Sequence, residues 1–203
     1  MPRAIGGIMA ALLFWSMRMK TLTGLLATVL LCSNATAGEI DLSFNDDAIR
    51  AFYAQDFRDT DLQSEFGVLN NSDEGTIFSF TLYQAGYASD GENPLQAGLG
   101  ARTGYVDGDS SGQNGIPLAV GGYLKYTFPY RNRLSLRADV YLGPDILTTL
   151  DLERYEDYTV RLAYNLMKTG DIYIGARYVK GEFDNDSDRL FDNGIHFGVN
   201  LRF

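Results

Sequence analysis

Residues 116–128 read IPLAVGGYLKYTF, and large apolar or aromatic side chains stand at almost every second position from Ile116 to Phe128. Small, polar and charged residues fill the positions between them. An alternation of period two is the pattern of a β-strand with two different faces. At 13 residues the run is longer than the five or six that are usual in soluble domains. The pattern recurs in 95–102, 133–142, 157–166, 171–178 and 195–203, and more weakly in 39–45, 49–57, 61–70 and 76–88.

Long alternating strands separated by turns are typical of transmembrane barrels. We therefore expect an all-β protein: an antiparallel up-and-down transmembrane β-barrel of eight to ten strands. Ten strands are favoured, and eight would follow if 39–57 formed an irregular N-terminal segment. A soluble periplasmic ligand-binding barrel is the alternative. It would show the same alternation with its apolar face turned inward.

The first 37 residues have the composition of a signal peptide. They hold three bases and no acid, an apolar run at 22–31, and the small-residue cleavage motif Ala-Thr-Ala at 35–37. We expect residues 1–37 to be removed, with Met17 or Met19 as an alternative start, and residues 38–203 to form the barrel. The only cysteine lies in the leader, so the barrel is expected to fold without disulfides.

Removal of the leader keeps all 26 acids but only 14 of the 17 bases, for a net charge of −12. Such an acidic chain lacks the basic surface of a nucleic-acid-binding protein. If the C-terminus is periplasmic, the outer loops fall near 45–48, 70–75, 106–115, 143–154 and 181–192. These loops hold 14 acids against two bases: Asp46, Asp47, Asp73, Glu74, Asp107, Asp109, Asp145, Asp151, Glu153, Glu182, Asp184, Asp186, Asp188 and Asp192, against Arg154 and Arg189.

Residues 184–188 (DNDSD) resemble the start of an EF-hand calcium loop. That loop requires glycine at its sixth position and glutamate at its twelfth, where this chain has Arg189 and Ile195. We therefore expect no metal site and no cofactor. Loose association of divalent cations with the acidic loops at the lipopolysaccharide surface stays open.

The polar faces of the strands carry charges of both signs. Inside a narrow barrel these charges should pair, because an unpaired charge in a dry interior is costly. We expect a structural charge network that fills the lumen, with a narrow solute path as the alternative. The expected network comprises Arg50, Glu65, Arg102, Lys125, Arg137, Asp139, Asp157, Arg161, Arg177, His196 and Arg202.

The chain ends in HFGVNLRF at 196–203. This resembles the C-terminal assembly signal of bacterial outer-membrane barrels, whose specified places are filled by His196, Gly198, Leu201 and Phe203. His196 is also the only histidine, so an outer-membrane acyltransferase or acylhydrolase is an alternative in which it would act as a base. Ser79, Ser135 and Thr159 would then be the candidate hydroxyl partners. A histidine in the polar place of the signal needs no catalytic role.

The barrel is similar to the YfaZ family of outer-membrane proteins of Gram-negative bacteria. The resemblance rests on 39–48, 94–100, 117–122, 138–145, 171–178 and the terminal strand. It implies a bacterial outer-membrane barrel and no known catalytic residues. We expect a structural, surface or narrow-channel role rather than an enzyme. The expected partners are outer-membrane lipid, lipopolysaccharide and the barrel-assembly machinery, with no nucleic acid, and the protein is expected to be monomeric.

Overall fold

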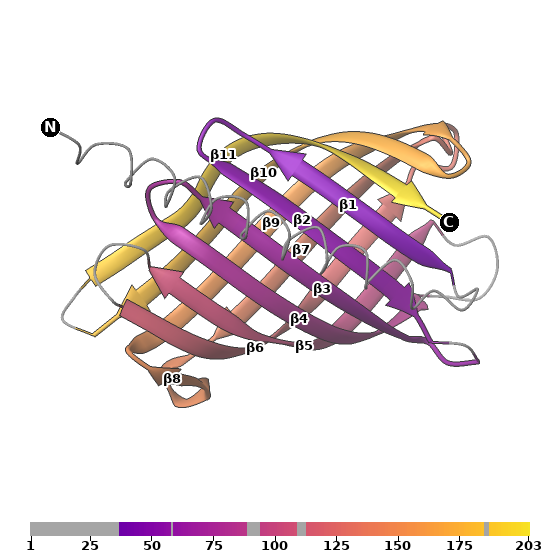
Figure 1. Cartoon of the computed structure of the whole chain (residues 1–203). Coiled ribbons are helices and arrows are strands. Elements are labelled where there is room, and N and C mark those ends of the chain that lie inside the picture. Colours follow the sequence, from indigo (N-terminus) through magenta and orange to yellow (C-terminus); the bar gives the residue numbers. More distant parts are fainter. Residues whose placement is uncertain (1–36, 58, 89–93, 109–112, 185–186) are drawn as a thin grey trace, which may run out of the picture. The chain divides into compact units, whose positions relative to one another are not determined.

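The structure is a computed structural model that describes residues 37–57, 59–88, 94–108, 113–184 and 187–203. The leader prediction for residues 1–37 lies outside these residues except for Ala37. No helix in the described ranges is long and apolar enough to cross a membrane. Residues 37–203 form one compact unit (Figure 1).

Ten long antiparallel strands form a closed ring, confirming the expected barrel and the favoured strand count. Each strand is hydrogen-bonded to its neighbours in the sequence, apart from the short strand β8, which lies in a loop beside β6. A single turn of 3-10 helix, η1 (Asp145–Leu147), precedes β8. The strands are β1 (Gly38–Phe44), β2 (Ala48–Asp56), β3 (Leu62–Asn71), β4 (Gly75–Tyr87), β5 (Leu95–Gly108), β6 (Gln113–Thr127), β7 (Leu134–Gly143), β8 (Thr148–Leu150), β9 (Leu152–Met167), β10 (Gly170–Phe183) and β11 (Ser187–Arg202).

The ring closes where the first strand meets the last. β1 pairs with β11 over six residues, with Ile40 opposite Leu201. Beyond this ladder, the Gly38 amide donates to the Phe203 carbonyl at 2.8 Å and the Phe203 amide donates back at 2.9 Å. Both chain ends of the barrel therefore lie at one end of it, which we call the terminal end. The opposite end, where the 45–47, 72–74 and 144–151 connections lie, is the loop end (Figure 1).

Apolar side chains cover the outside of the barrel. Leu99 is 76% exposed, and Ile195 and Val160 are 64% and 48% exposed, each between inward-pointing neighbours. Charged side chains such as Arg50, Arg102 and Asp157 are buried inside. The alternative with the apolar face inside is therefore wrong for this chain. An apolar exterior around a polar interior is the arrangement of a transmembrane barrel.

The predicted outer loops are too long, because the strands continue into them. β5 runs to Gly108, β9 begins at Leu152 and β10 runs to Phe183. The side-chain pattern explains the error, because the apolar face changes sides near the loop end. Val106 is buried inside while Asp107 is exposed, and Val179 and Phe183 are buried inside. The alternation continues there, but the apolar residues now point inward and the polar residues outward. A strand prediction that requires apolar residues on the outward face therefore ends too early.

One of the predicted loop acids lies inside the barrel. Asp192 is 2% exposed and bound to Arg177, so its assignment to the solvated loop set is wrong. Asp107, Glu153, Glu182 and Asp188 are on strands rather than in loops. Asp109 and Asp186 lie outside the described residues.

Candidate functional site

The interior of the barrel holds all eleven predicted lumen residues. Each lines at least one of two cavities, of about 40 Å³ and about 220 Å³. The smaller cavity is bordered by Arg50, Glu65, Arg102, Arg137, Asp139, Asp157, Arg161, Arg177 and His196. Lys125 and Arg202 border the larger cavity, together with Glu65, Arg137 and Arg161.

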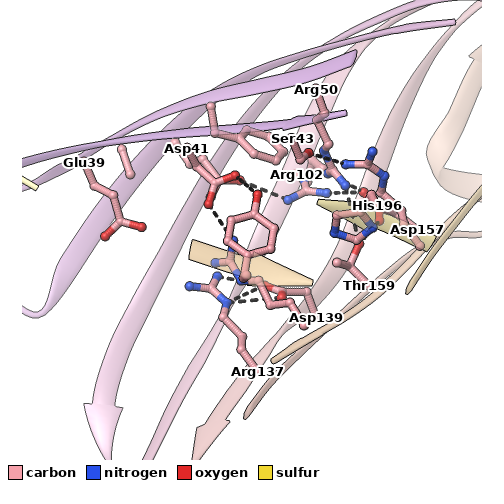
Figure 2. A pocket seen from close by; sticks show the side chains of 16 residues that line it. Glu39, Asp41, Ser43, Arg50, Arg102, Arg137, Asp139, Asp157, Thr159 and His196 are labelled. Carbon is pink, nitrogen blue, oxygen red and sulfur yellow. Dashed lines mark hydrogen bonds and ion pairs between the residues drawn. The ribbon is translucent and has the colours of Figure 1, made fainter. Parts of the chain in front are cut away.

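Asp157 on β9 is the centre of the charge network. Its Oδ2 accepts from Arg50 Nη2 at 2.7 Å and from Arg102 Nη1 at 2.5 Å, and all three side chains are at least nine-tenths buried. Arg102 also reaches Glu65 at 3.1 Å. β2 and β5, which carry the two arginines, are not neighbours of β9 in the ring, so these ion pairs cross the lumen (Figure 2). They fix the spacing of opposite walls.

A second group of contacts lies around Asp41 on β1. Its carboxylate accepts from Arg161 Nη1 at 2.7 Å and from the Tyr173 hydroxyl. Arg137 donates to Asp139, two residues away on the same strand, through Nε at 2.9 Å and Nη2 at 2.7 Å. Every arginine named here thus has a carboxylate partner, as a buried charge requires.

Aromatic rings complete the packing of the guanidinium groups. Arg102 lies 3.9 Å from the centroid of the Tyr141 ring, and Arg137 lies 4.0 Å from that of Tyr123. Such contacts are worth more when the cation is desolvated. The tyrosines therefore have a structural role in the lumen, which the sequence reasoning missed.

The sequence reasoning also missed several lumen acids: Asp41 and Asp192, and Glu39, Asp56 and Asp171, which line the larger cavity. Asp41 lies between Ile40 and Leu42, so the alternation of the short 39–45 run does place it inward. Asp192 binds Arg177, which also donates to the Ser43 hydroxyl at 3.0 Å. Asp192 carried no such signal, because a β-bulge opposite Val179 and Lys180 interrupts the alternation beside it.

His196 does not form the base–hydroxyl pair that an acyl-transfer enzyme needs. It points into the lumen, is 1% exposed and packs edge-on against the Tyr173 ring at 5.9 Å. In the described part of the chain no serine or threonine hydroxyl hydrogen-bonds to it, and its Nδ1 has no partner. The Thr159 hydroxyl is within hydrogen-bond distance of Asp157 instead, at 3.3 Å. Lipid on the outside of the barrel cannot reach this imidazole.

An apolar cluster fills the lumen at the loop end. We call it the seal, and its members are only 0–4% exposed. Packing is tight enough that a Cβ on Gly115 would lie 2.2 Å from that of Leu152. A water-filled path lined by these side chains would leave them accessible, and none of them is. Its members are Ala48, Leu69, Ile77, Val106, Ala119, Tyr141, Leu152, Tyr155, Val179, Phe183 and Phe191.

The larger cavity lies at the terminal end, and we call it the vestibule. It reaches the end of the barrel, because Ala37, Asp56 and Phe203 are among its lining residues. Its volume of about 220 Å³ is more than ten times the roughly 10–15 Å³ that one water molecule needs. Three layers therefore follow one another from the terminal end inward. The first is the open polar vestibule, the second is the layer of ion-paired side chains around Asp41 and Asp157, which we call the charge layer, and the third is the apolar seal.

A family model described as "YfaZ precursor" matches residues 17–203, which includes the whole barrel. The chain belongs to the YfaZ family. No curated protein matches it. Among solved structures, this YfaZ-family chain is similar to the KdgM porin, with 11% identity, a TM-score of 0.44, and coverage of 83% of this chain and 99% of the porin. It is also similar to the KdgM porin in complex with disordered oligogalacturonate, with 10% identity, a TM-score of 0.45 and the same coverage. A third similar structure is the outer-membrane channel DcaP of Acinetobacter baumannii, with 17% identity, a TM-score of 0.41, and coverage of 80% of this chain and 54% of DcaP.

The C-terminal strand of this YfaZ-family barrel shows where the proposed signal residues lie. His196 points inward, Leu201 and Phe203 are about half exposed on the outside, and Gly198 faces the lumen. A Cβ on Gly198 would lie 2.2 Å from the Tyr173 ring, so this position requires glycine for packing alone. A role of the four residues in assembly stays a prediction.

Proposed function

We propose that this YfaZ-family chain is an integral outer-membrane protein of a Gram-negative bacterium, with its terminal end in the periplasm and its loop end outside. The apolar exterior supports contact with lipid, and the acidic residues at the loop end support contact with the lipopolysaccharide layer. Insertion would use the barrel-assembly machinery. A single closed ring needs no second copy to complete it, which supports a monomer.

The role supported best is that of a closed barrel with a structural or surface function, rather than an open pore. The observation that carries this is the seal, whose central side chains Phe191 and Val106 are 0% exposed. Ion pairs that cross the lumen add rigidity below it. A small barrel filled by its own side chains is expected to stay closed.

Recording in planar lipid bilayers tests this proposal. We expect the wild-type protein to give no sustained open-pore conductance. Phe191→Ala removes a ring from the seal and should create conducting events. Phe197→Ala removes a ring that is 53% exposed on the outside, and this matched control should behave as the wild type does. A wild-type protein that conducts steadily would contradict the proposal.

A gated narrow channel is the second candidate, and the polar space below the seal favours it. The vestibule and the smaller cavity together extend from the terminal end into the charge layer. The seal lies between this space and the loop end, and hydrophobic constrictions are known to gate pores. In this case the wild type would show brief openings, and Phe191→Ala would lengthen them.

A further inference from the structure

Two oppositely charged residues face the vestibule from opposite walls. Lys125 lies on β6 and Glu39 on β1. In the ring of ten strands, β1 and β6 are five strands apart in either direction, so they are diametrically opposed. Both residues line the same cavity of about 220 Å³.

The Lys125 wall is a row of three cations. Lys125 is directly opposite Arg137 on β7, and Arg137 is directly opposite Arg161 on β9. Like charges in directly opposed positions destabilise a sheet. The two arginines are compensated by Asp139 and Asp41. Lys125 makes no hydrogen bond or ion pair with any residue that the structure describes, and the carboxylate that acts on it electrostatically is Glu39 across the cavity. This wall therefore has one positive charge without a contact partner.

The Glu39 wall is acidic. Glu39 accepts a hydrogen bond from the Asn200 side-chain amide but makes no ion pair within the described ranges. Figure 2 shows its carboxylate apart from the dashed network of the charge layer. Asp56, close by on β2, also lines the vestibule and has a glutamine, Gln63, as its hydrogen-bond partner. Arg202 on β11 is directly opposite Glu39, but its ion pair is with Asp171 at 2.9 Å. Three acids, Glu39, Asp56 and Asp171, therefore share one cation on this wall, which keeps a net negative charge.

A solute that carries both charges would satisfy both walls at once. An anion alone would leave Glu39 uncompensated, and a cation alone would leave Lys125 uncompensated. We propose that the vestibule binds a small zwitterionic solute from the periplasmic side, with its oxyanion group at Lys125 and its ammonium group at Glu39. This goes beyond the closed-barrel function and does not require the barrel to conduct.

Isothermal titration calorimetry of the detergent-solubilised protein tests the proposal with defined probes. The zwitterionic probes are glycine, 4-aminobutanoate, 6-aminohexanoate and 2-aminoethyl phosphate. The first three differ in the distance between their two charged groups, and the fourth tests a phosphate in place of the carboxylate. Butanoate and butylammonium are the singly charged references. We expect at least one zwitterion to bind roughly tenfold or more tightly than both references, because only the zwitterion makes a charge-assisted hydrogen bond at each wall.

Substitutions assign the two ends of the solute. Lys125→Gln and Glu39→Gln should each abolish the preference for the zwitterion. Lys168→Gln changes an exposed lysine in the turn between β9 and β10 and should leave it intact. The double variant Lys125→Glu, Glu39→Lys should restore the preference for the zwitterion, which would then bind in the opposite orientation, with its ammonium group at position 125. The proposal is overturned if wild type shows no zwitterion preference, or if the preference survives both single substitutions in protein that keeps its folded gel mobility.

Discussion

Arg102 on β5 and Asp157 on β9 are joined across the lumen by an ion pair of 2.5 Å between Nη1 and Oδ2. Arg50 binds the same carboxylate oxygen at 2.7 Å. One carboxylate therefore ties three strands that are not neighbours, and it is 2% exposed. The contact therefore restrains the distance between opposite walls of the barrel.

Asp157→Asn should destabilise the barrel strongly. The change leaves Arg50 and Arg102 buried without their shared negative charge, and breaking a buried pair typically costs about 3–5 kcal/mol. Urea titration in micelles, followed by circular dichroism, measures the free energy of unfolding. Asp188→Asn is the control, because Asp188 forms an exposed pair with Lys180. An Asp157→Asn protein as stable as the control would show that the network is dispensable.

Gly198→Ala should also destabilise the barrel, through packing. A Cβ at this position would lie 2.2 Å from the Tyr173 ring, whose hydroxyl binds Asp41. Overpacking of this kind costs about 1–3 kcal/mol. The temperature at which the folded form loses its gel mobility is the measurement. Gly86→Ala adds the same methyl group where nothing lies within 4 Å, and it should have little effect.

Val160→Arg should block folding into lipid. Val160 is 48% exposed on the outside of β9, and arginine at the bilayer midplane costs about 2–4 kcal/mol. The folded fraction after dilution into lipid vesicles is the readout. Ile146→Arg places the same charge on the loop-end turn η1, where the residue is 87% exposed, and should fold normally. Equal folding of both variants would mean that the β9 exterior does not face lipid.

The sequence predicted the ten strands and the inward direction of the charged residues because both depend only on alternation along one strand. It did not predict which charges meet, because partners such as Arg50 and Asp157 are 107 residues apart and depend on ring closure and strand tilt. It also failed at the loop end. There the bulge beside Val179 lets both Phe191 and Asp192 turn inward, and the apolar face moves from the outside to the inside.

The layered lumen is tested most directly by the water accessibility of single cysteines, since the barrel contains none of its own. Ser135→Cys in the vestibule and Ile146→Cys in the loop-end turn should react rapidly with a charged maleimide. Ala119→Cys in the seal, at a position that is 0% exposed, should stay protected in the folded protein and react only after unfolding. Labelling of Ala119→Cys at the rate of Ser135→Cys would show that water passes the seal, and would contradict the closed barrel.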